Sequence, residues 1–226
     1  MLSRRIALLG SLVGLAAATA PGPSAHAQSA QTQSAQTQTG FRPTAQDRTD
    51  LARVEAYLNG LRTLKAQFLQ VAPDGGLSRG TAWLERPGHM RFQYDPPAPF
   101  LLVANHGLLM FHDTSLRQTS NIPLNRTPLG MLLADRATLS GDVTVTGLQR
   151  LPGQLQVSLV RTDNPGEGTL TLIFADNPLA LRQWTVLDAQ RKETRVTLHA
   201  IDLGGRFDSK LFEFVEPAPF QGGGGG

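Results

Sequence analysis

Arg86 is the residue of this sequence that ordinary core packing explains least well. Residues 80–86 alternate as a β-strand does, which puts Ala82, Leu84 and Arg86 on one side. A guanidinium group against an apolar face is costly unless its N–H groups find acceptors. Backbone carbonyls at helix ends lack partners inside their helix, so an inward Arg86 would hold a helix against the sheet. A small twist of the strand would instead turn Arg86 to solvent, and the alternation leaves both interpretations open.

Catalytic and metal-binding groups are sparse. The sequence has no cysteine, which excludes disulfides, thiolate nucleophiles, cysteine metal sites and a lipid on an N-terminal cysteine. The five histidines form no metal-binding motif, and His106 and His112, across an expected hairpin, are predicted at the surface. Asp188, Glu193 and Asp202 fall on or near different strands and are expected on solvated faces. Because the His-Glu-x-x-His and phosphate-loop motifs are also missing, we predict no enzymatic activity, no metal and no cofactor.

Residues 1–27 have the organisation of a secretory signal peptide. Arg4 and Arg5 precede a short apolar run, and the sequence Ala-His-Ala at 25–27 matches a cleavage site. We therefore predict cleavage after Ala27 and a periplasmic location, with an uncleaved anchor as the alternative, although the run is short for a membrane span. Without the two arginines the formal net charge falls from +3 to +1. A nearly neutral chain without interleaved basic and aromatic residues is not expected to bind nucleic acid.

Composition divides the rest of the chain into three parts. Residues 28–42 are rich in Gln, Ser, Thr and Ala, cannot bury an apolar face, and are predicted to form a disordered tether. Residues 43–220 have the length and apolar content of one domain. Residues 221–226 are predicted to be a flexible glycine tail.

Two amphipathic helices are expected in the domain. The first begins at Thr44, with Asp47 in a capping-box arrangement, and ends near residues 59–60. Its apolar stripe comprises Leu51, Ala52, Val54, Ala56, Leu58 and Leu61, and its opposite, solvent-facing side comprises Arg48, Asp50, Arg53 and Glu55. The second helix begins at Thr127-Pro128, and its apolar side comprises Leu129, Leu132 and Leu133.

The remainder alternates as short strands separated by turn residues. We expect strands at 65–72, 80–86, 89–95, 101–104, 108–112, 116–122, 143–146, 155–161, 168–174, 181–188 and 193–202, with a short last one at 212–215. So many strands in an antiparallel meander cannot lie flat, so the sheet curls. The predicted fold class is mainly β (α+β): an unclosed antiparallel β-barrel with a lid of amphipathic helices over its concave face.

Strand alternation also predicts which side chains face inward. Met90, Phe92 and Tyr94 share one side of their strand, and the later strands contribute Leu170, Leu172, Phe174, Trp184, Val186, Val196 and Leu198. This surface has two interpretations, a fully packed core and a cavity for an apolar ligand beneath helices that can move. The pattern taken alone favours the packed core.

Several segments, in this order, resemble one protein family. They include Phe68-Leu69-Gln70, Gly80-Thr81-Ala82-Trp83-Leu84-Glu85-Arg86-Pro87, Arg91-Phe92-Gln93-Tyr94, Thr127-Pro128-Leu129 and Trp184-Thr185-Val186-Leu187-Asp188. From about residue 51 to residue 214 the chain resembles the LolA family of outer-membrane lipoprotein carriers, periplasmic chaperones. The turn at 105–107 departs from the family pattern and leaves the register of the next strand open.

The resemblance implies an unclosed barrel whose helical lid covers a hydrophobic cavity for acyl chains. The implied cavity residues are Trp83, Leu84, Met90, Phe92, Tyr94, Leu109, Phe111 and Leu132. The implied lid latch is Arg86, and the lid helices contribute Leu51, Val54, Leu58, Leu129 and Leu133. The implied partners are acylated lipoproteins as cargo, an ATP-driven lipoprotein-releasing transporter in the inner membrane, and an outer-membrane acceptor.

The absent cysteine separates this chain from the acceptor, which shares the fold but is itself lipidated. A monomer without a cofactor is expected. Two alternative functions stay open on the same fold. One is a carrier of free lipids or glycolipids, and the other is a regulator that senses lipoproteins.

Overall fold

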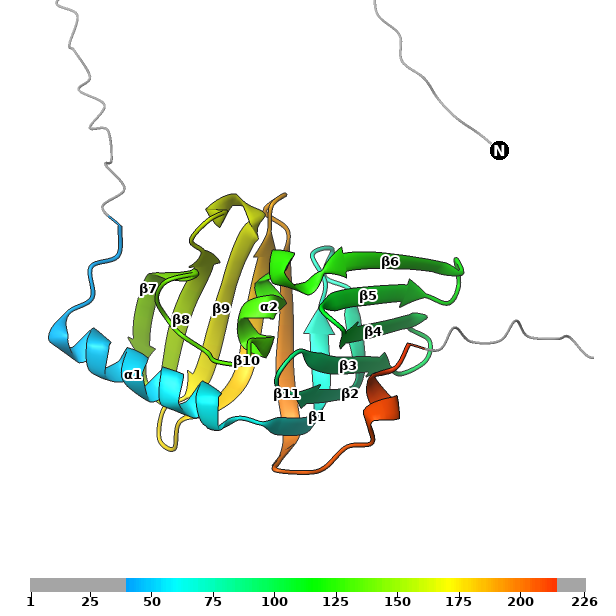
Figure 1. Ribbon diagram of the computed structural model, residues 1–226, viewed down its shortest axis with the longest axis horizontal. Helices are drawn as coiled ribbons and strands as arrows, with labels where there is room; N and C mark the ends of the chain where they lie inside the picture. Colours follow the sequence, from blue (N-terminus) through cyan, green and yellow to red (C-terminus); the bar gives the residue numbers. More distant parts are fainter. Residues whose placement is uncertain (1–39, 215–226) are drawn as a thin grey trace, which may run out of the picture. The chain divides into compact units, whose positions relative to one another are not determined.

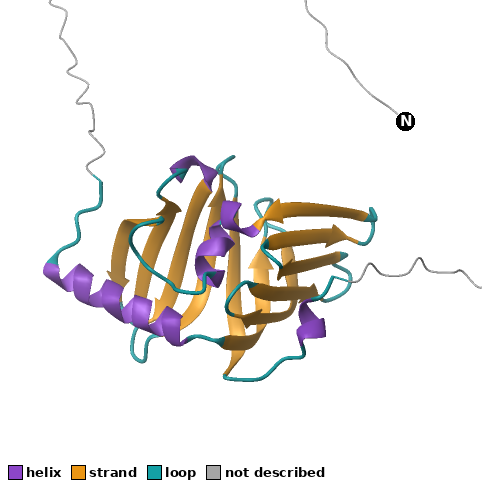
Figure 2. Cartoon of the chain, viewed as in Figure 1, coloured by secondary structure: helices purple, strands orange, loops and turns teal. Residues whose placement is uncertain are grey.

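The computed structural model describes residues 40–214, which contain a single antiparallel sheet of eleven strands (Figures 1 and 2). The strands are β1 (Thr63–Val71), β2 (Leu77–Glu85), β3 (His89–Tyr94), β4 (Phe100–Asn105), β5 (Leu108–Asp113), β6 (Gln118–Pro123), β7 (Val143–Leu151), β8 (Gln154–Arg161), β9 (Gly168–Ala175), β10 (Ala180–Asp188) and β11 (Glu193–Leu203). Their order is β6-β5-β4-β3-β2-β1-β11-β10-β9-β8-β7. Because β6 and β7 are separate edges, the sheet does not close. The predicted unclosed antiparallel sheet is confirmed.

Two helices lie on one face of this sheet (Figure 1). Helix α1 (Ala45–Gly60) crosses one end of the half formed by β7–β10, and α2 (Pro128–Leu133) lies in front of the middle of the sheet. The predicted capping box is present, since the Asp47 N–H donates to Thr44 Oγ1 (3.2 Å) and the Thr44 N–H donates to Asp47 Oδ2 (2.8 Å). Thr127 caps α2, and Pro128 takes its first position, as predicted. Short 3₁₀ turns are present at Leu124–Arg126, Pro165–Glu167 and Ser209–Phe212.

Aromatic rings form the centre of the face that the helices cover. Phe68 packs against Phe92 and Tyr94 with ring centroids 4.7 and 5.0 Å apart, and Phe92 meets Trp184 edge-on at 5.9 Å. The other half of the sheet contributes buried Leu155, Val157, Leu159, Leu170, Leu172, Phe174, Leu181, Val196 and Leu198, with Val186 partly buried beside them. Strand alternation therefore predicted the inward residues correctly.

The N-terminal half of α1 differs from its prediction. Asp50, expected on the solvent side, is buried, whereas Ala52 and Ala56, expected in the apolar stripe, are exposed. The buried positions of the helix follow the spacing 47, 50, 54 and 58, so its inner side is rotated toward the two aspartates. A carboxylate is tolerated there because arginine side chains reach it, as described below.

The turn between β4 and β5 keeps the regular hairpin register. Its two loop residues, His106 and Gly107, both have positive φ (49° and 76°), the backbone conformation that a two-residue hairpin of this kind requires. Ala104 remains opposite Leu109. The departure from the family pattern at 105–107 therefore does not shift the strand that follows.

The last described segment lies on the convex face of the sheet. The predicted strand at 212–215 is wrong for its described part, because Asp208 accepts a hydrogen bond from the Lys210 N–H and starts a 3₁₀ turn instead. Two hydrogen bonds hold this segment on the sheet: Asn105 Nδ2 donates to the Phe212 carbonyl (3.0 Å), and Arg91 Nη1 donates to the Leu211 carbonyl (3.2 Å).

His112 corrects a second prediction. It was expected at the surface but is 2% exposed, with its ring centroid 5.3 Å from that of Phe214 and its Nδ1 2.9 Å from Thr119 Oγ1. The C-terminal segment covers this part of the convex face, which sequence spacing did not indicate. His106 is exposed, as predicted.

Some predictions concern residues outside 40–214. These are the signal peptide at 1–27, the tether at 28–39 and the glycine tail at 221–226, together with the last six residues of the predicted domain. Within the described part of the chain, no helix is both long and apolar enough to cross a membrane.

Candidate functional site: the concave face and its lid

The concave face of β2 and β3 is lined by predicted site residues. Leu84, Met90 and Phe92 are all nearly inaccessible to solvent and belong to one continuous apolar core with the helices. Tyr94 lies on the same face, where its hydroxyl donates to Gln70 Oε1 (2.8 Å). Burial raises the pKa of Tyr94 to about 12, so this hydroxyl is a neutral donor at physiological pH.

The face continues onto β4 and β5, where it is less covered. Leu109 is buried, and Phe111 is partly buried with its ring 5.3 Å from that of Phe100. Register places Phe111 opposite Leu102, which is in turn opposite Phe92, so these side chains share the inner side. The helices therefore cover these two rings less completely than they cover the side chains of β2 and β3.

Trp83 does not belong to this surface. It was predicted in the cavity together with Leu84, but adjacent residues of a strand point to opposite faces, and Leu84 is the buried one. Trp83 lies on the convex side, where Lys65 Nζ is 6.0 Å from its ring centroid. We therefore remove Trp83 from the set of cavity residues.

The lid residues pack into the same core. Val54 and Leu58 of α1 and Leu132 and Leu133 of α2 are buried, and Leu51 and Leu129 are partly buried against them. Tyr57 fixes α1 further along the helix, because its hydroxyl accepts the Leu181 N–H (3.0 Å) and its ring meets Phe174 edge-on. In this arrangement the lid side chains occupy the concave face, so an apolar ligand has to displace them.

Arg86 points inward with Leu84, as one of the two interpretations of the strand predicted. Its Nε and Nη2 donate to the Ala134 carbonyl at the end of α2 (3.0 and 2.6 Å), and its Nη1 donates to the Leu58 carbonyl of α1. Burial lowers the pKa of Arg86, and the charge of Arg62 lowers it further, yet a guanidinium keeps its proton at neutral pH. One charged group, directly after the end of β2, therefore binds the carbonyl ends of both lid helices.

Helix α1 is also joined to the loop that follows α2. Asn59 of α1 donates from Nδ2 to the Ala137 carbonyl and accepts the Ala137 N–H at Oδ1, both at 2.9 Å. Glu55 Oε1 accepts the Leu139 N–H at 2.6 Å. Three hydrogen bonds therefore join the loop after α2 to the C-terminal half of α1.

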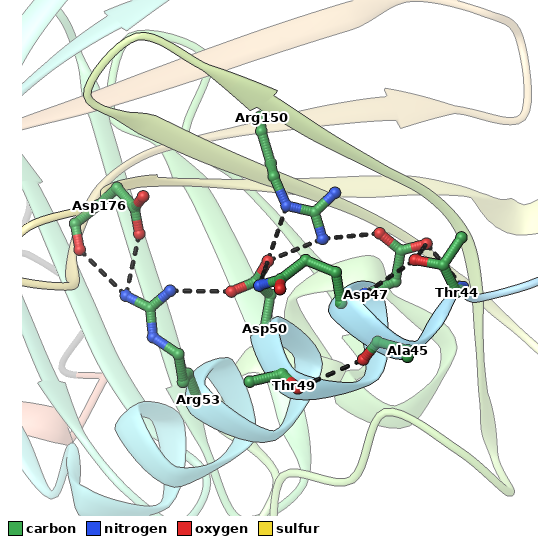
Figure 3. Close-up of polar contacts among 9 residues, drawn as sticks. Thr44, Ala45, Asp47, Thr49, Asp50, Arg53, Arg150 and Asp176 are labelled. Atoms are coloured by element: carbon green, nitrogen blue, oxygen red, sulfur yellow. Dashed lines mark hydrogen bonds and ion pairs between the residues drawn. The ribbon is translucent and has the colours of Figure 1, made fainter.

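An ionic network fixes the other half of α1 (Figure 3). Arg150 of β7 donates to Asp50 Oδ2 and to Asp47 Oδ1, each at 2.7 Å. Arg53 bridges Asp50 Oδ1 (2.9 Å) and Asp176 Oδ1 (2.9 Å) in the turn between β9 and β10. We call these five residues the α1 ionic network.

Hydrogen bonds lower the pKa of both aspartates on α1. Hydrogen bonds from the Thr44 N–H and hydroxyl, and then from Arg150, lower the pKa of Asp47 to about 2. Burial acts to raise the pKa of Asp50, but hydrogen bonds from Arg150, Arg53 and Gln46 outweigh it and leave that pKa below 3.8. Both side chains are therefore carboxylates at neutral pH.

Sequence reasoning did not identify this network. The predicted strand ended at residue 146, before Arg150, and Asp47 was interpreted only as a capping residue. The helical spacing could have indicated it, because positions 47 and 50 lie on the same side of the helix as the buried Val54. Among residues 40–214 no group of three or more His, Cys, Asp or Glu side chains is arranged to hold a metal ion.

Comparison with known proteins decides the family. The family model described as outer membrane lipoprotein carrier protein LolA matches residues 59–215. The chain belongs to the LolA family. Similar proteins named outer-membrane lipoprotein carrier protein include one from Methylococcus capsulatus, 29% identical over 188 residues, which covers 79% of this chain and 89% of the relative. A second, from Legionella pneumophila, is 28% identical over 180 residues, with 75% and 87% covered.

A third LolA-family relative of the same name, from Pseudomonas aeruginosa, is 27% identical over 185 residues and covers 76% of this chain and 86% of its own length. The family match begins at Asn59, near the end of α1. It therefore includes Arg86 and most of the concave face but not Asp47, Asp50 or Arg53 of the ionic network.

Proposed function

We propose that this protein is a periplasmic chaperone that binds the acyl chains of lipoproteins and carries them from the inner to the outer membrane. The observation that carries the proposal is an apolar concave face covered by two helices that Arg86 holds by their backbone carbonyls. Membership of the LolA family and the names of the relatives support the same function.

A movable lid gives such a carrier an intermediate affinity. Burying one methylene stabilises a complex by about 0.8 kcal/mol, so one acyl chain of roughly fifteen methylenes would gain about 12 kcal/mol before costs. Val54, Leu58, Leu132 and Leu133 fill the same surface when the lid is closed. Cargo therefore gains only the difference between its own burial and that of the lid, less the hydrogen bonds of Arg86 that opening breaks.

The route of transport follows from the proposed cargo. The partners are an ATP-driven lipoprotein-releasing transporter in the inner membrane and a lipoprotein acceptor in the outer membrane. Export with cleavage after Ala27 would place the mature chain in the periplasm, which the composition of residues 1–27 supports. The absence of cysteine from the sequence supports a carrier that is itself without a lipid anchor. The proposed role is binding and transfer, without catalysis.

The first experiment is to isolate the mature protein from its native periplasm and identify bound hydrophobic molecules by mass spectrometry. Triacylated lipoproteins in a one-to-one complex would support the carrier function. Free phospholipid or glycolipid would instead support a lipid carrier on the same face. A protein that is empty, and that also fails to take up a fluorescent fatty acid, would contradict the proposal, because the concave face would then be only a packed core.

A further inference from the structure

Helix α1 changes character along its length. Its buried residues are Asp47 and Asp50 in the N-terminal half and Val54 and Leu58 in the C-terminal half. The first half therefore docks on the sheet largely through charge, and the second half docks through apolar contact. The two halves are expected to respond differently to salt and to changes of charge.

The C-terminal half is held by contacts that contain no ion pair. Arg86 donates to the Leu58 carbonyl, and Asn59 and Glu55 bind backbone groups of the loop after α2. Val54 and Leu58 are almost fully buried. This half is expected to leave the sheet only when another apolar group replaces Val54 and Leu58 there.

The N-terminal half depends on Arg150. The Asp50 side chain is 4% exposed and the Arg150 side chain 42% exposed, so the guanidinium is within reach of solvent while the carboxylate is not. Without Arg150, Asp47 would keep its contacts with Thr44, and Asp50 would keep Arg53 and Gln46. A buried carboxylate that loses a charged partner is destabilised, and both carboxylates would regain water if this half lifted from the sheet.

We propose that Arg150 is a positioning residue that, through Asp47 and Asp50, keeps the N-terminal half of the lid helix closed, so that the lid opens from this end. This first step of opening leaves the contacts of Arg86 with Leu58 and Ala134 in place, and these contacts break only when the lid opens fully. The lid then has two separate fastenings, one at the end of β2 and the other on the edge strand β7. The role in cargo binding rests on the proposed function, whereas the position of the helix can be measured without any ligand.

The chain contains no cysteine, so a pair of introduced cysteines can carry spin labels without background. We would label T49C, on the exposed side of α1, and T144C, exposed on β7 and about 20 Å along that strand from Arg150 at 3.3 Å per residue. Double electron–electron resonance then gives the distance between helix and strand. We expect one narrow distance in the parent protein and a broader, longer distribution in R150Q.

Two further variants separate positioning from loss of folding. R150K keeps the charge and should recover most of the narrow distance, because an ammonium group can still pair with Asp50 although not in the same two-carboxylate geometry. R48Q removes an exposed arginine from the same helix, whose side chain contacts the Pro43 carbonyl, and should leave the distance unchanged. In the parent protein 1 M NaCl should broaden the distribution toward that of R150Q.

A fluorescent fatty acid provides the functional readout. We expect it to enter R150Q about tenfold faster than the parent protein, since the open population rises by about that factor when a charge-assisted pair is lost. A narrow, parent-like distance in folded R150Q would overturn the inference, as would faster probe entry in R48Q equal to that in R150Q. If the parent protein binds no probe at all, the proposed function fails, while the spin-label distances still decide how α1 is held.

Discussion

Replacing Arg86 with leucine tests how the lid controls release. The guanidinium makes three hydrogen bonds to two carbonyl groups, those of Ala134 and Leu58. Hydrogen bonds to a charged group contribute about 1.5–3 kcal/mol each, but Arg86 is also buried, and leucine removes the cost of that burial. We therefore assign a net loss of about 2 kcal/mol to the closed state, which shifts the lid equilibrium toward the open form by about 30-fold.

This shift favours retention of cargo. When closing stabilises the lid by less free energy, the lid competes less well with the acyl chain for the concave face. R86L should therefore take up cargo normally and release it slowly. Stopped-flow measurement of a fluorescent fatty acid leaving the protein into acceptor vesicles should show a dissociation rate reduced by up to about 30-fold. Transfer of a lipoprotein to its outer-membrane acceptor should be impaired in parallel.

The neighbouring arginine provides the control. Arg62 is 65% exposed and lies 3.9 Å from Asp135, so R62L removes the same charge without touching the carbonyls that Arg86 binds. R62L should release the fatty acid at the parent rate. Release from R86L at the parent rate, in a protein with an unchanged circular dichroism spectrum and urea midpoint, would refute the latch reasoning.

Three further predictions follow from other parts of the structure. Because the pKa of Asp47 is lowered to about 2, its carboxylate stabilises the folded state above about pH 4, and this contribution is lost as the pH falls toward 2. Urea titrations should therefore show a larger difference in unfolding free energy between the parent protein and D47N at pH 6 than at pH 2.5. A Cβ at Gly80 would lie 2.0 Å from the Gln93 carbonyl oxygen, so G80A should lower the thermal midpoint clearly, whereas G60A, which meets nothing within 4 Å, should leave it unchanged or slightly raised. F92A should weaken fatty-acid binding at least tenfold in a fluorescence titration, whereas W83A, on the opposite face, should change the affinity less than twofold; equal losses would contradict the assignment of faces.

Local patterns in the sequence were enough to predict most of the strands and helices and the inner face of the sheet. The side-chain period of two in a strand puts Met90, Phe92 and Tyr94 on one side wherever the strand lies, and the structure agrees. Likewise, Thr44 and Asp47 three residues apart make a capping box by local geometry alone. The same period shows the error in placing Trp83 and Leu84 in one cavity, because adjacent strand residues face opposite sides.

The tertiary structure decided which polar groups are buried and what they bind. Alternation left Arg86 either inward or outward, and its direction follows from the carbonyls of Leu58 and Ala134, which two separate helices bring to it. Asp50 looked like a solvent-facing residue because a carboxylate is buried only where a cation is supplied. Of its two cations, Arg53 is three residues away on the same helix, but Arg150 is 100 residues away along the chain, and no local pattern encodes its approach. Periodicity thus determines faces, whereas the partners of buried charges depend on how distant strands and helices meet.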